Sequence, residues 1–347
     1  MNPPAGLQVP RRVLIVKPSS LGDVVTAMPI LRGLKRSFKE AQVWWLAADS
    51  CAALVEHDSD LAGVIVFNRR LLGTAWRSPR GIGGVRRLVR ALKSPEFDWA
   101  IDVQGLLRSA LMTRATRAAV RAGFAQPREP AAAWFYNHKV DASATHTVAR
   151  NIELARSLGI DAQPQDMTLQ VAPAGRQFAE EFCRRVGVGP RGFLVAAPPA
   201  RWPTKLYPAR HWRTVVRALS RDLPVALIGS PKERNLVADA CDGLEGRGVI
   251  DLSGQTDVAQ MVGLIAASAG VICGDSAAGF IAPAVGVDCV TLIGPTRLEL
   301  TGPYLRGCAL VADVPCQGCL KRRCRHMTCM QSISPSDVIA AARRMLA

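Results

Sequence analysis

The chain has 347 residues, enough for two domains that each bury a hydrophobic core. Hydrophobic residues make up 49% and charged residues 21%, which excludes a disordered chain and is ordinary for a globular protein. The formal net charge of +16 predicts an anionic partner, and nucleic acid, an anionic membrane surface and a phosphorylated substrate would each satisfy it.

No apolar run of the kind found in a secretory signal peptide occurs from Met1 to Arg11. The most apolar long stretch, Leu264 to Gly294, is interrupted by Asp275 and Asp288, which favours a buried strand and helix over a membrane span. We therefore expect a cytoplasmic protein whose ten cysteines are reduced thiols.

The first part of the chain alternates short apolar runs with segments that carry apolar residues at helical spacing. Such runs predict buried strands, and the helical spacing predicts helices between them. In chain order we expect a strand from Arg12, a helix over Asp23 to Phe38, a strand over Gln42 to Ala47, a short helix over Cys51 to His57, strands over Gly63 to Phe67 and Trp99 to Val103, and helices over Leu106 to Ala118 and Thr145 to Leu158.

A second alternating series follows the polar, proline-containing stretch from Ile160 to Gln170, where we place the domain boundary. Its expected strands are Phe193 to Ala197, Pro224 to Ile228, Val249 to Asp251, Gly270 to Cys273 and Cys289 to Ile293. Its expected helices are Ala174 to Val186, His211 to Ser220, Lys232 to Asp242, Val258 to Ser268, Ala277 to Val285 and Ser336 to Leu346.

Strands that alternate with helices indicate βαβ units and parallel sheets. The sequence therefore predicts an α/β protein with two Rossmann-like domains that face a central cleft, 1–165 and 166–333. The remaining segment, 334–347, is expected to be a C-terminal helix with the option of packing back on the N-terminal domain.

The opening strand runs into Pro18, Ser19, Ser20 and Gly22, residues suited to a tight turn before a helix. Asp23 then lies in the first helical turn, at the carboxyl end of a strand, where open α/β sheets bind their ligands. A charge that only stabilises the start of the helix is the alternative for Asp23.

The run from Val16 to Val24, Val-Lys-Pro-Ser-Ser-Leu-Gly-Asp-Val, resembles the N-terminal signature of the ADP-heptose:lipopolysaccharide heptosyltransferases, glycosyltransferase family 9. The resemblance implies the GT-B arrangement of two Rossmann-like domains. It also implies that Asp23 is the catalytic base and that Ser19 and Ser20 contact the acceptor.

No acidic residue occurs between Asp60 and Glu96, an interval that is dense in arginine. A solvated helix face and a surface that binds a polyanion both explain this charge. In the family, basic residues of the N-terminal domain meet the acidic Kdo sugars and phosphates of the lipid A acceptor, so Arg69 and Arg70 become candidate acceptor contacts. The basic residues are Arg69, Arg70, Arg77, Arg80, Arg86, Arg87, Arg90 and Lys93.

The segment from Ile101 to Ala110 is similar to the family's strand-to-helix segment, in which an Asp-x-Gln-Gly run reaches the cleft. It makes Gln104 and Arg108 candidate acceptor contacts, although Gln104 could equally cap a loop. Arg128 lies in a further segment similar to the family, before Trp134, and is another candidate acceptor contact.

The segment from Arg201 to Trp212 resembles the family's Lys-x-Trp/Tyr-Pro-x-x-x-Trp element. Lys205 is therefore expected to hold the departing ADP, with Thr204 hydrogen-bonded to a phosphate oxygen; an ordinary surface lysine is the alternative. Glu233 matches an acidic residue that contacts the ribose hydroxyls, and a first-turn glutamate favoured by the helix dipole is the alternative.

The run from Cys273 to Phe280 aligns with the family's Asp-Thr-Gly-x-x-His segment, which binds the donor's diphosphate and heptose. Asp275 matches, Ser276 keeps a hydroxyl and Ala277 replaces the glycine, and these three residues are candidate donor contacts. Phe280 replaces the histidine and cannot supply an imidazole hydrogen bond. Thr296, in the Gly-Pro-Thr element that follows, is a further candidate donor contact.

Four cysteines, Cys316, Cys319, Cys324 and Cys329, lie close together in a basic segment near the C-terminus. Four thiols at this spacing can hold structural zinc or an iron–sulfur cluster. Free thiols or a disulfide are the alternatives. A catalytic metal is not expected.

These observations predict an inverting, metal-independent heptosyltransferase that takes ADP-L-glycero-D-manno-heptose as donor. Its expected acceptor is an anionic Kdo–lipid A inner core at the cytoplasmic face of the inner membrane. A nucleic-acid-binding protein that uses the basic interval and a metal-bound cysteine cluster is the alternative. Aromatic residues make up only 5%, which is sparse for the base stacking that nucleic-acid binding uses. The first strand is not followed by a G-x-G-x-x-G turn, which argues against a Rossmann dehydrogenase.

Overall fold

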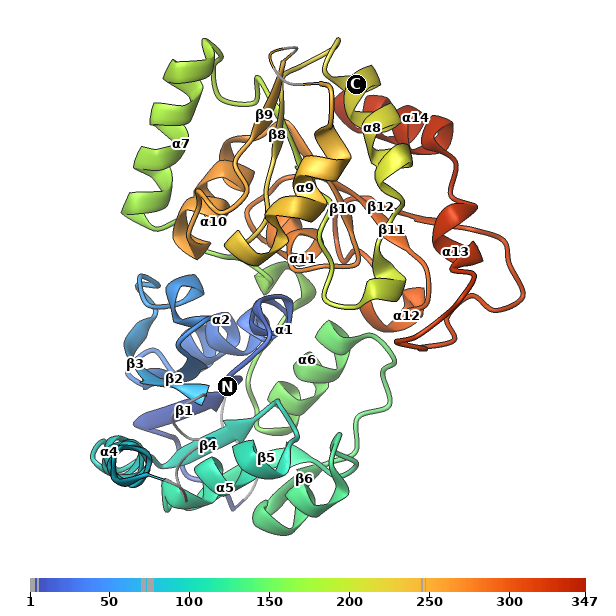
Figure 1. Ribbon diagram of the computed structural model, residues 1–347. Helices are drawn as coiled ribbons and strands as arrows, with labels where there is room; N and C mark the ends of the chain where they lie inside the picture. The colour runs from blue at the N-terminus through green and yellow to red at the C-terminus, as the bar shows by residue number, and fades with distance from the viewer. Residues whose placement is uncertain (1–3, 5, 70–72, 74–77, 245, 247) are drawn as a thin grey trace. The chain divides into compact units, whose positions relative to one another are not determined.

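The computed structural model describes residues 4, 6–69, 73, 78–244, 246 and 248–347, and the chain divides into two compact units (Figure 1). The first unit is Met1–Leu169 and the second Gln170–Ala347, a division close to the predicted boundary after residue 165. Each unit contains a six-stranded sheet whose paired strands are all parallel.

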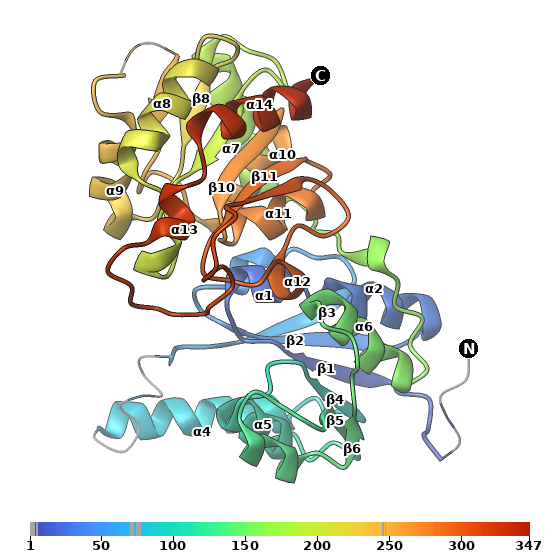
Figure 2. The same cartoon turned by 90° about the vertical axis from the view of Figure 1, so that its right-hand side faces the viewer.

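The first sheet has the order β3-β2-β1-β4-β5-β6. Its central strand, β1, is apolar throughout after Arg12 and fully buried, as expected for a parallel strand with helices on both faces. Helices α2 and α6 lie on one face of this sheet, and α4 and α5 on the other (Figure 2). The strands are β1 Arg12–Val16, β2 Gln42–Ala48, β3 Leu61–Phe67, β4 Trp99–Asp102, β5 Val120–Phe124 and β6 His138–Val140. The helices are α1 Leu21–Val25, α2 Met28–Ser37, α4 Pro79–Lys93, α5 Leu107–Ala115 and α6 Thr147–Ser157, with the 3₁₀ turns η1 Ala52–Leu54, η2 Pro130–Phe135 and η3 Pro164–Asp166.

Two departures from the sequence-based expectation concern the helices of this unit. The single helix predicted over Asp23 to Phe38 is two helices, α1 and α2, because Pro29 in the first turn of α2 has no N–H to continue the preceding helix. The basic interval contains a full helix, α4, whose buried Leu88 and Leu92 pack on the sheet. Arg70 and Arg77 lie outside the described residues.

The second sheet has the order β12-β11-β10-β7-β8-β9. Its core joins the strands to Trp212 of α8 and to Val338 and Ala342 of α14. The strands are β7 Leu194–Ala197, β8 Val225–Leu227, β9 Val249–Asp251, β10 Gly270–Gly274, β11 Cys289–Ile293 and β12 Cys308–Val311. The helices are α7 Pro173–Val186, α8 Ala209–Leu219, α9 Arg234–Cys241, α10 Val258–Ala267, α11 Ala278–Ala284, α12 Leu298–Thr301, α13 Thr328–Gln331 and α14 Pro335–Leu346, with the 3₁₀ turns η4 Pro203–Lys205 and η5 Pro231–Glu233.

The terminal helix α14 belongs to the second unit, where it packs against α8, β10, β11 and β12. The apolar stripe of α14 explains this packing, because it completes the core beneath α8. A further contact of 334–347 with the N-terminal domain stays a prediction.

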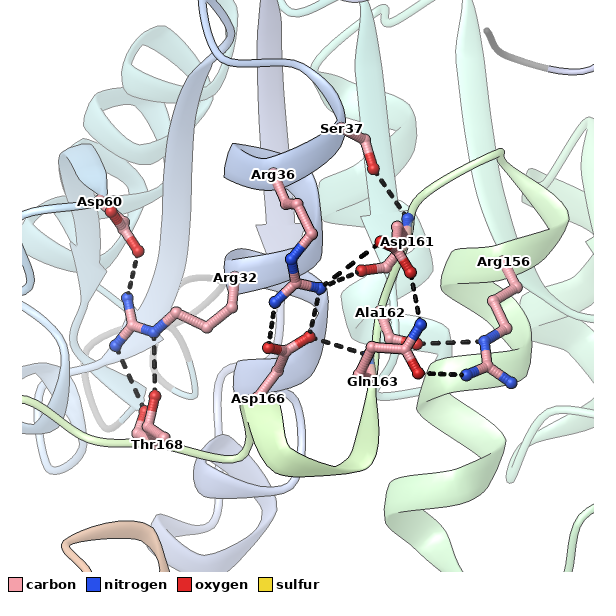
Figure 3. Close-up of polar contacts among 10 residues, drawn as sticks. All are labelled: Arg32, Arg36, Ser37, Asp60, Arg156, Asp161, Ala162, Gln163, Asp166 and Thr168. Atoms are coloured by element: carbon pink, nitrogen blue, oxygen red, sulfur yellow. Dashed lines mark hydrogen bonds and ion pairs between the residues drawn. The ribbon is translucent and has the colours of Figure 1, made fainter. Parts of the chain in front are cut away.

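Ion pairs fasten the segment after α6 to helix α2 (Figure 3). The Arg36 guanidinium makes a bidentate pair with the buried carboxylate of Asp166. Arg32 pairs with Asp60 at 2.6 Å and donates to the Thr168 hydroxyl at 3.1 Å. The chain is therefore part of the first unit up to Thr168, although this stretch has little regular structure of its own.

Candidate functional site

Both sheets have the doubly wound order, in which successive strands are added toward one edge and then, starting beside the first strand, toward the other edge. The two adjacent central strands where this happens form the switch point. In the first sheet these strands are β1 and β4, and in the second they are β7 and β10. Ligands of such sheets bind outside the carboxyl ends of the strands at this switch point. Candidate site residues follow each of the four strands, so the fold gives each unit one site.

Asp23 follows β1 and closes a capping box with Ser20 at the start of α1. Its Oδ2 accepts hydrogen bonds from the Ser20 amide and from the Ser20 hydroxyl, both at 2.8 Å. Its Oδ1 lies 4.0 Å from the Lys17 ammonium, and 39% of the side chain remains exposed. Burial alone would raise the pKa of Asp23, but Lys17, the two hydrogen bonds and the more distant Arg128 together lower it below its ordinary value. Asp23 is therefore an ionised carboxylate open to a ligand.

Lys17 is a site residue that the sequence analysis did not single out. Its side chain is only 5% exposed, and its ammonium donates to the Val103 carbonyl at 2.8 Å. Burial lowers the pKa of Lys17, and the carboxylates of Asp23 and Asp102 oppose that effect. A lysine at the end of an otherwise apolar strand is the sequence signal that could have identified it.

Buried Asp102 ends β4 and shapes the turn that carries Gln104. It accepts hydrogen bonds from the Tyr136 hydroxyl at 2.7 Å and from the Gln104 amide at 2.8 Å. Burial raises the pKa of Asp102 even though these bonds favour its charged form. Gly105 continues the turn at φ +66, and a Cβ there would lie 3.1 Å from the Arg128 amide, so glycine is required.

The predicted acceptor residues Ser19, Arg69, Gln104 and Arg108 line one small pocket beside Phe67. Arg69 donates to the Ser19 hydroxyl at 3.4 Å, and Gln104 accepts from the Ser19 amide at 3.3 Å. Gln104 thus joins two loops, which fits the alternative that it caps a loop, and it also lines the pocket. Ser20 is engaged by Asp23, while Arg128 is exposed and close enough to influence the pKa of both Lys17 and Asp23.

Helix α4 presents a basic surface without an acidic residue in the helix. Only a narrow stripe of α4 is buried, so its long basic side chains lie in solvent. The exposed basic residues of α4 are Arg80, Arg86, Arg87, Arg90 and Lys93. The two explanations offered for the basic interval, a solvated helix face and an anion-binding surface, are both compatible with this arrangement.

In the second unit, Lys205 follows β7 and Asp275 follows β10. The Lys205 ammonium lies 2.8 Å from Oδ2 of Asp275, and both side chains are largely buried. The Thr296 hydroxyl donates to the same carboxylate oxygen at 2.5 Å. Three of the predicted donor residues therefore form one hydrogen-bonded cluster at the switch point.

Thr204 has a partner within the protein. Its hydroxyl donates to the Lys321 carbonyl at 2.9 Å, and the residue is buried. A hydroxyl has one proton to donate, so a bond to a phosphate oxygen would take the place of this one, and that contact stays a prediction. Thr204 attaches the cysteine-rich segment to the turn that carries Lys205.

Glu233 and Ser276 occupy the predicted strand ends. Glu233 accepts from the Ser230 amide and hydroxyl at 2.8 and 2.7 Å, so the helix-start alternative is realised, and the ribose contact stays a prediction. Ser276 and Ala277 are partly exposed ahead of the seven-residue helix α11. Phe280 lies half-buried in that helix.

The cysteine-rich segment, residues 316–329, brings its four thiols into one neighbourhood. Burial raises the pKa of Cys329, and the nearby Cys316, Cys319 and Cys324 raise it further. All four are free thiols. Among the residues that the structure describes, no three His, Cys, Asp or Glu side chains are arranged to hold a metal ion. A structural zinc ion or an iron–sulfur cluster at these thiols stays a prediction, beside the free-thiol and disulfide alternatives.

Two Rossmann-type units with a carboxylate at one switch point and a buried lysine–aspartate pair at the other are typical of glycosyltransferases of the GT-B type. The profile of glycosyltransferase family 9 (heptosyltransferase) matches residues 85–329. The chain belongs to this family. In the part of the chain that is described, we find no helix with the length and apolar character needed to cross a membrane.

Relatives and solved structures extend this likeness over nearly the whole chain. The chain is 32% identical to lipopolysaccharide heptosyltransferase 1 of Pseudomonas aeruginosa, with 91% of this chain and 88% of that protein covered. It is 28% identical to the Escherichia coli protein of the same name, with 84% and 91% covered. The E. coli heptosyltransferase WaaC with ADP has a TM-score of 0.78 at 24% identity, with 96% of this chain and 99% of that chain covered. These likenesses lend no support to the nucleic-acid alternative.

Proposed function

We propose that the protein transfers a heptose from ADP-L-glycero-D-manno-heptose to a Kdo sugar of the lipid A inner core, with inversion at the anomeric carbon. Its membership of family 9 and its 32% identity to a lipopolysaccharide heptosyltransferase 1 support the reaction class. The observation that carries the mechanism is Asp23, an ionised and partly exposed carboxylate held beside a buried lysine.

Asp23 acts as the general base of this mechanism. Its carboxylate takes the proton of the acceptor hydroxyl as the hydroxyl oxygen bonds to the anomeric carbon. The bond from that carbon to the β-phosphate oxygen breaks, and ADP leaves with the electron pair. Ser19, Gln104, Arg69 and Arg108 orient the acceptor through their shared pocket.

Lys205 stabilises the charge that develops on departing ADP. Asp275 and Thr296 fix the position of the ammonium before the donor arrives, so little reorganisation is needed in the transition state. Transfer then requires the donor held by one unit to meet the acceptor held by the other.

The remaining parts of the proposal concern metal and location. Transfer proceeds without a metal ion, with the Lys205 ammonium stabilising the charge of the leaving group. The protein works in the cytoplasm on the surface of the inner membrane, where the exposed arginines of α4 meet anionic lipid headgroups.

The test is a transfer assay with ADP-heptose and a series of truncated Kdo–lipid A acceptors, in buffer with EDTA. Asp23→Asn keeps an oxygen that can accept both Ser20 hydrogen bonds, and it should lower kcat by about 10²- to 10⁴-fold while ADP binding stays unchanged. Asp141→Asn removes an exposed carboxylate of the same unit and serves as the matched control. A wild-type protein without transfer activity contradicts the function, and an active Asp23→Asn enzyme contradicts the assignment of the base.

A further inference from the structure

The cysteine-rich segment is attached to the elements that carry the proposed donor site. The amides of Gly318 and Leu320 donate to the carbonyls of Gly294 and Pro295 at 3.3 and 2.7 Å. The Gln317 side chain donates to the Thr296 carbonyl at 3.2 Å. With the Thr204 bond to Lys321, these contacts hold the segment against both the Lys205 turn and the Thr296 loop.

This attachment places a second cation over the Trp202 ring that Lys205 also contacts. The Lys205 ammonium lies 4.5 Å from the ring centre of Trp202, and the guanidinium carbon of Arg322 lies 4.7 Å from the same centre. A planar guanidinium stacked on an aromatic ring keeps its fork of N–H donors free for another partner. Arg322 is exposed, and within the described part of the chain it forms no ion pair.

The charges around Lys205 indicate why a second cation is needed. Lys205 is already compensated by Asp275 at 2.8 Å. A nucleoside diphosphate brings more than one negative charge, and α11, with seven residues, contributes only a small dipole. The lysine–aspartate pair by itself is close to neutral, so it leaves most of the diphosphate charge unbalanced.

We propose that Arg322 is a phosphate-binding residue of the donor site, which Trp202 and the cysteine-rich segment hold in position to bind the donor's diphosphate with Lys205. The inference rests on the proposed function, because it takes an ADP-activated sugar as the ligand. It gives the cysteine-rich segment a role in donor binding that requires no metal.

The experiment measures ADP and adenosine binding to the full-length protein by calorimetry, together with the KM for ADP-heptose. Arg322→Ala should weaken ADP binding and raise the donor KM by about 10-fold or more, the effect of losing a charge-assisted hydrogen bond. Adenosine binding should stay unchanged, because it has no phosphate. Arg323→Ala, which removes the same charge from the neighbouring exposed position, should change ADP binding by less than about twofold.

Two further variants separate binding from folding. Arg322→Lys keeps the charge but loses the planar fork, so its ADP affinity should fall between those of the wild type and Arg322→Ala. Trp202→Leu removes the stacking platform and should weaken ADP binding in the same direction. Equal ADP affinity in the Arg322→Ala and Arg323→Ala variants would overturn the inference, as would an equal loss of ADP and adenosine binding. Failure of the wild type to bind ADP would instead overturn the proposed function.

Discussion

Replacing Lys17 by methionine tests whether the buried ammonium keeps Asp23 ionised. The two charged groups are 4.0 Å apart, a separation at which unit charges interact by about 1 kcal/mol in water and about 4 kcal/mol near a protein surface. Because Asp23 keeps 39% of its side chain exposed, solvent screening favours the lower half of that range. Loss of the ammonium should therefore raise the pKa of Asp23, because it removes about 1 to 2 kcal/mol of stabilisation from the ionised carboxylate.

The direction of the expected pH effect follows from the base mechanism. In the wild type the pKa of Asp23 lies below its ordinary value, so the acid limb of kcat/KM lies at low pH. Protonation removes the base, and the higher pKa of Asp23 in Lys17→Met moves that limb to higher pH. The other charged or titratable groups that face this pair are Asp102, Arg128 and Cys51.

The assay is the pH profile of kcat/KM for heptose transfer, with thermal unfolding measured in parallel. Lys93→Met, which removes an exposed charge from α4, is the matched control and should leave the profile unchanged. The Val103 carbonyl loses its donor in Lys17→Met, so a loss of about 1 kcal/mol of stability is also expected. A folded Lys17→Met enzyme with an unshifted acid limb would refute the coupling between Lys17 and Asp23.

Two further predictions concern features outside the switch points. Arg36→Met leaves the buried Asp166 carboxylate without its guanidinium and should destabilise the protein by about 1–2 kcal/mol in calorimetry, whereas Arg156→Met, which loses only neutral acceptors, should cost less. Equal effects of the two changes would contradict the ion pair's role. Reversing the charge of Arg86 and Arg87 together should weaken binding to phosphatidylserine vesicles by more than about tenfold, at about 1 kcal/mol per basic residue, and unchanged vesicle binding would exclude α4 as the contact surface.

The sequence predicts the fold well because parallel strands buried on both faces are nearly continuous apolar runs, as β1 and β10 are. It misses the inner strand β5, which contains an arginine and a glycine, and the short edge strands β6 and β12, which carry polar or exposed residues. It underestimates α4 because three glycines interrupt its apolar spacing. Local pattern decides these cases, and the pattern is weak where a strand lies at an edge or a helix buries few residues.

The candidate site is easiest to predict where one short segment carries both the residue and its partners, whereas Lys205, Asp275 and Thr296 were predicted one by one from the resemblance to the family. Asp23 meets this condition, because Ser20 and Lys17 lie within the same run. Arg322 does not, because its position depends on a distant segment returning to Trp202. Residues placed by such long-range packing have no local signal in the sequence.

Asp23 and Glu233 show how a shared local motif can support different chemistry. Each carboxylate closes a box with a serine three residues earlier and accepts two hydrogen bonds on a single oxygen. The second oxygen of Asp23 faces the buried ammonium of Lys17, whereas that of Glu233 has no hydrogen-bond partner among the residues described. A carboxylate tuned by a buried cation suits proton transfer, and one with an unoccupied oxygen suits hydrogen bonds from neutral hydroxyls such as those of a ribose. The capping pattern is common to both residues, so Lys17 is what distinguishes the proposed base from the proposed ribose contact.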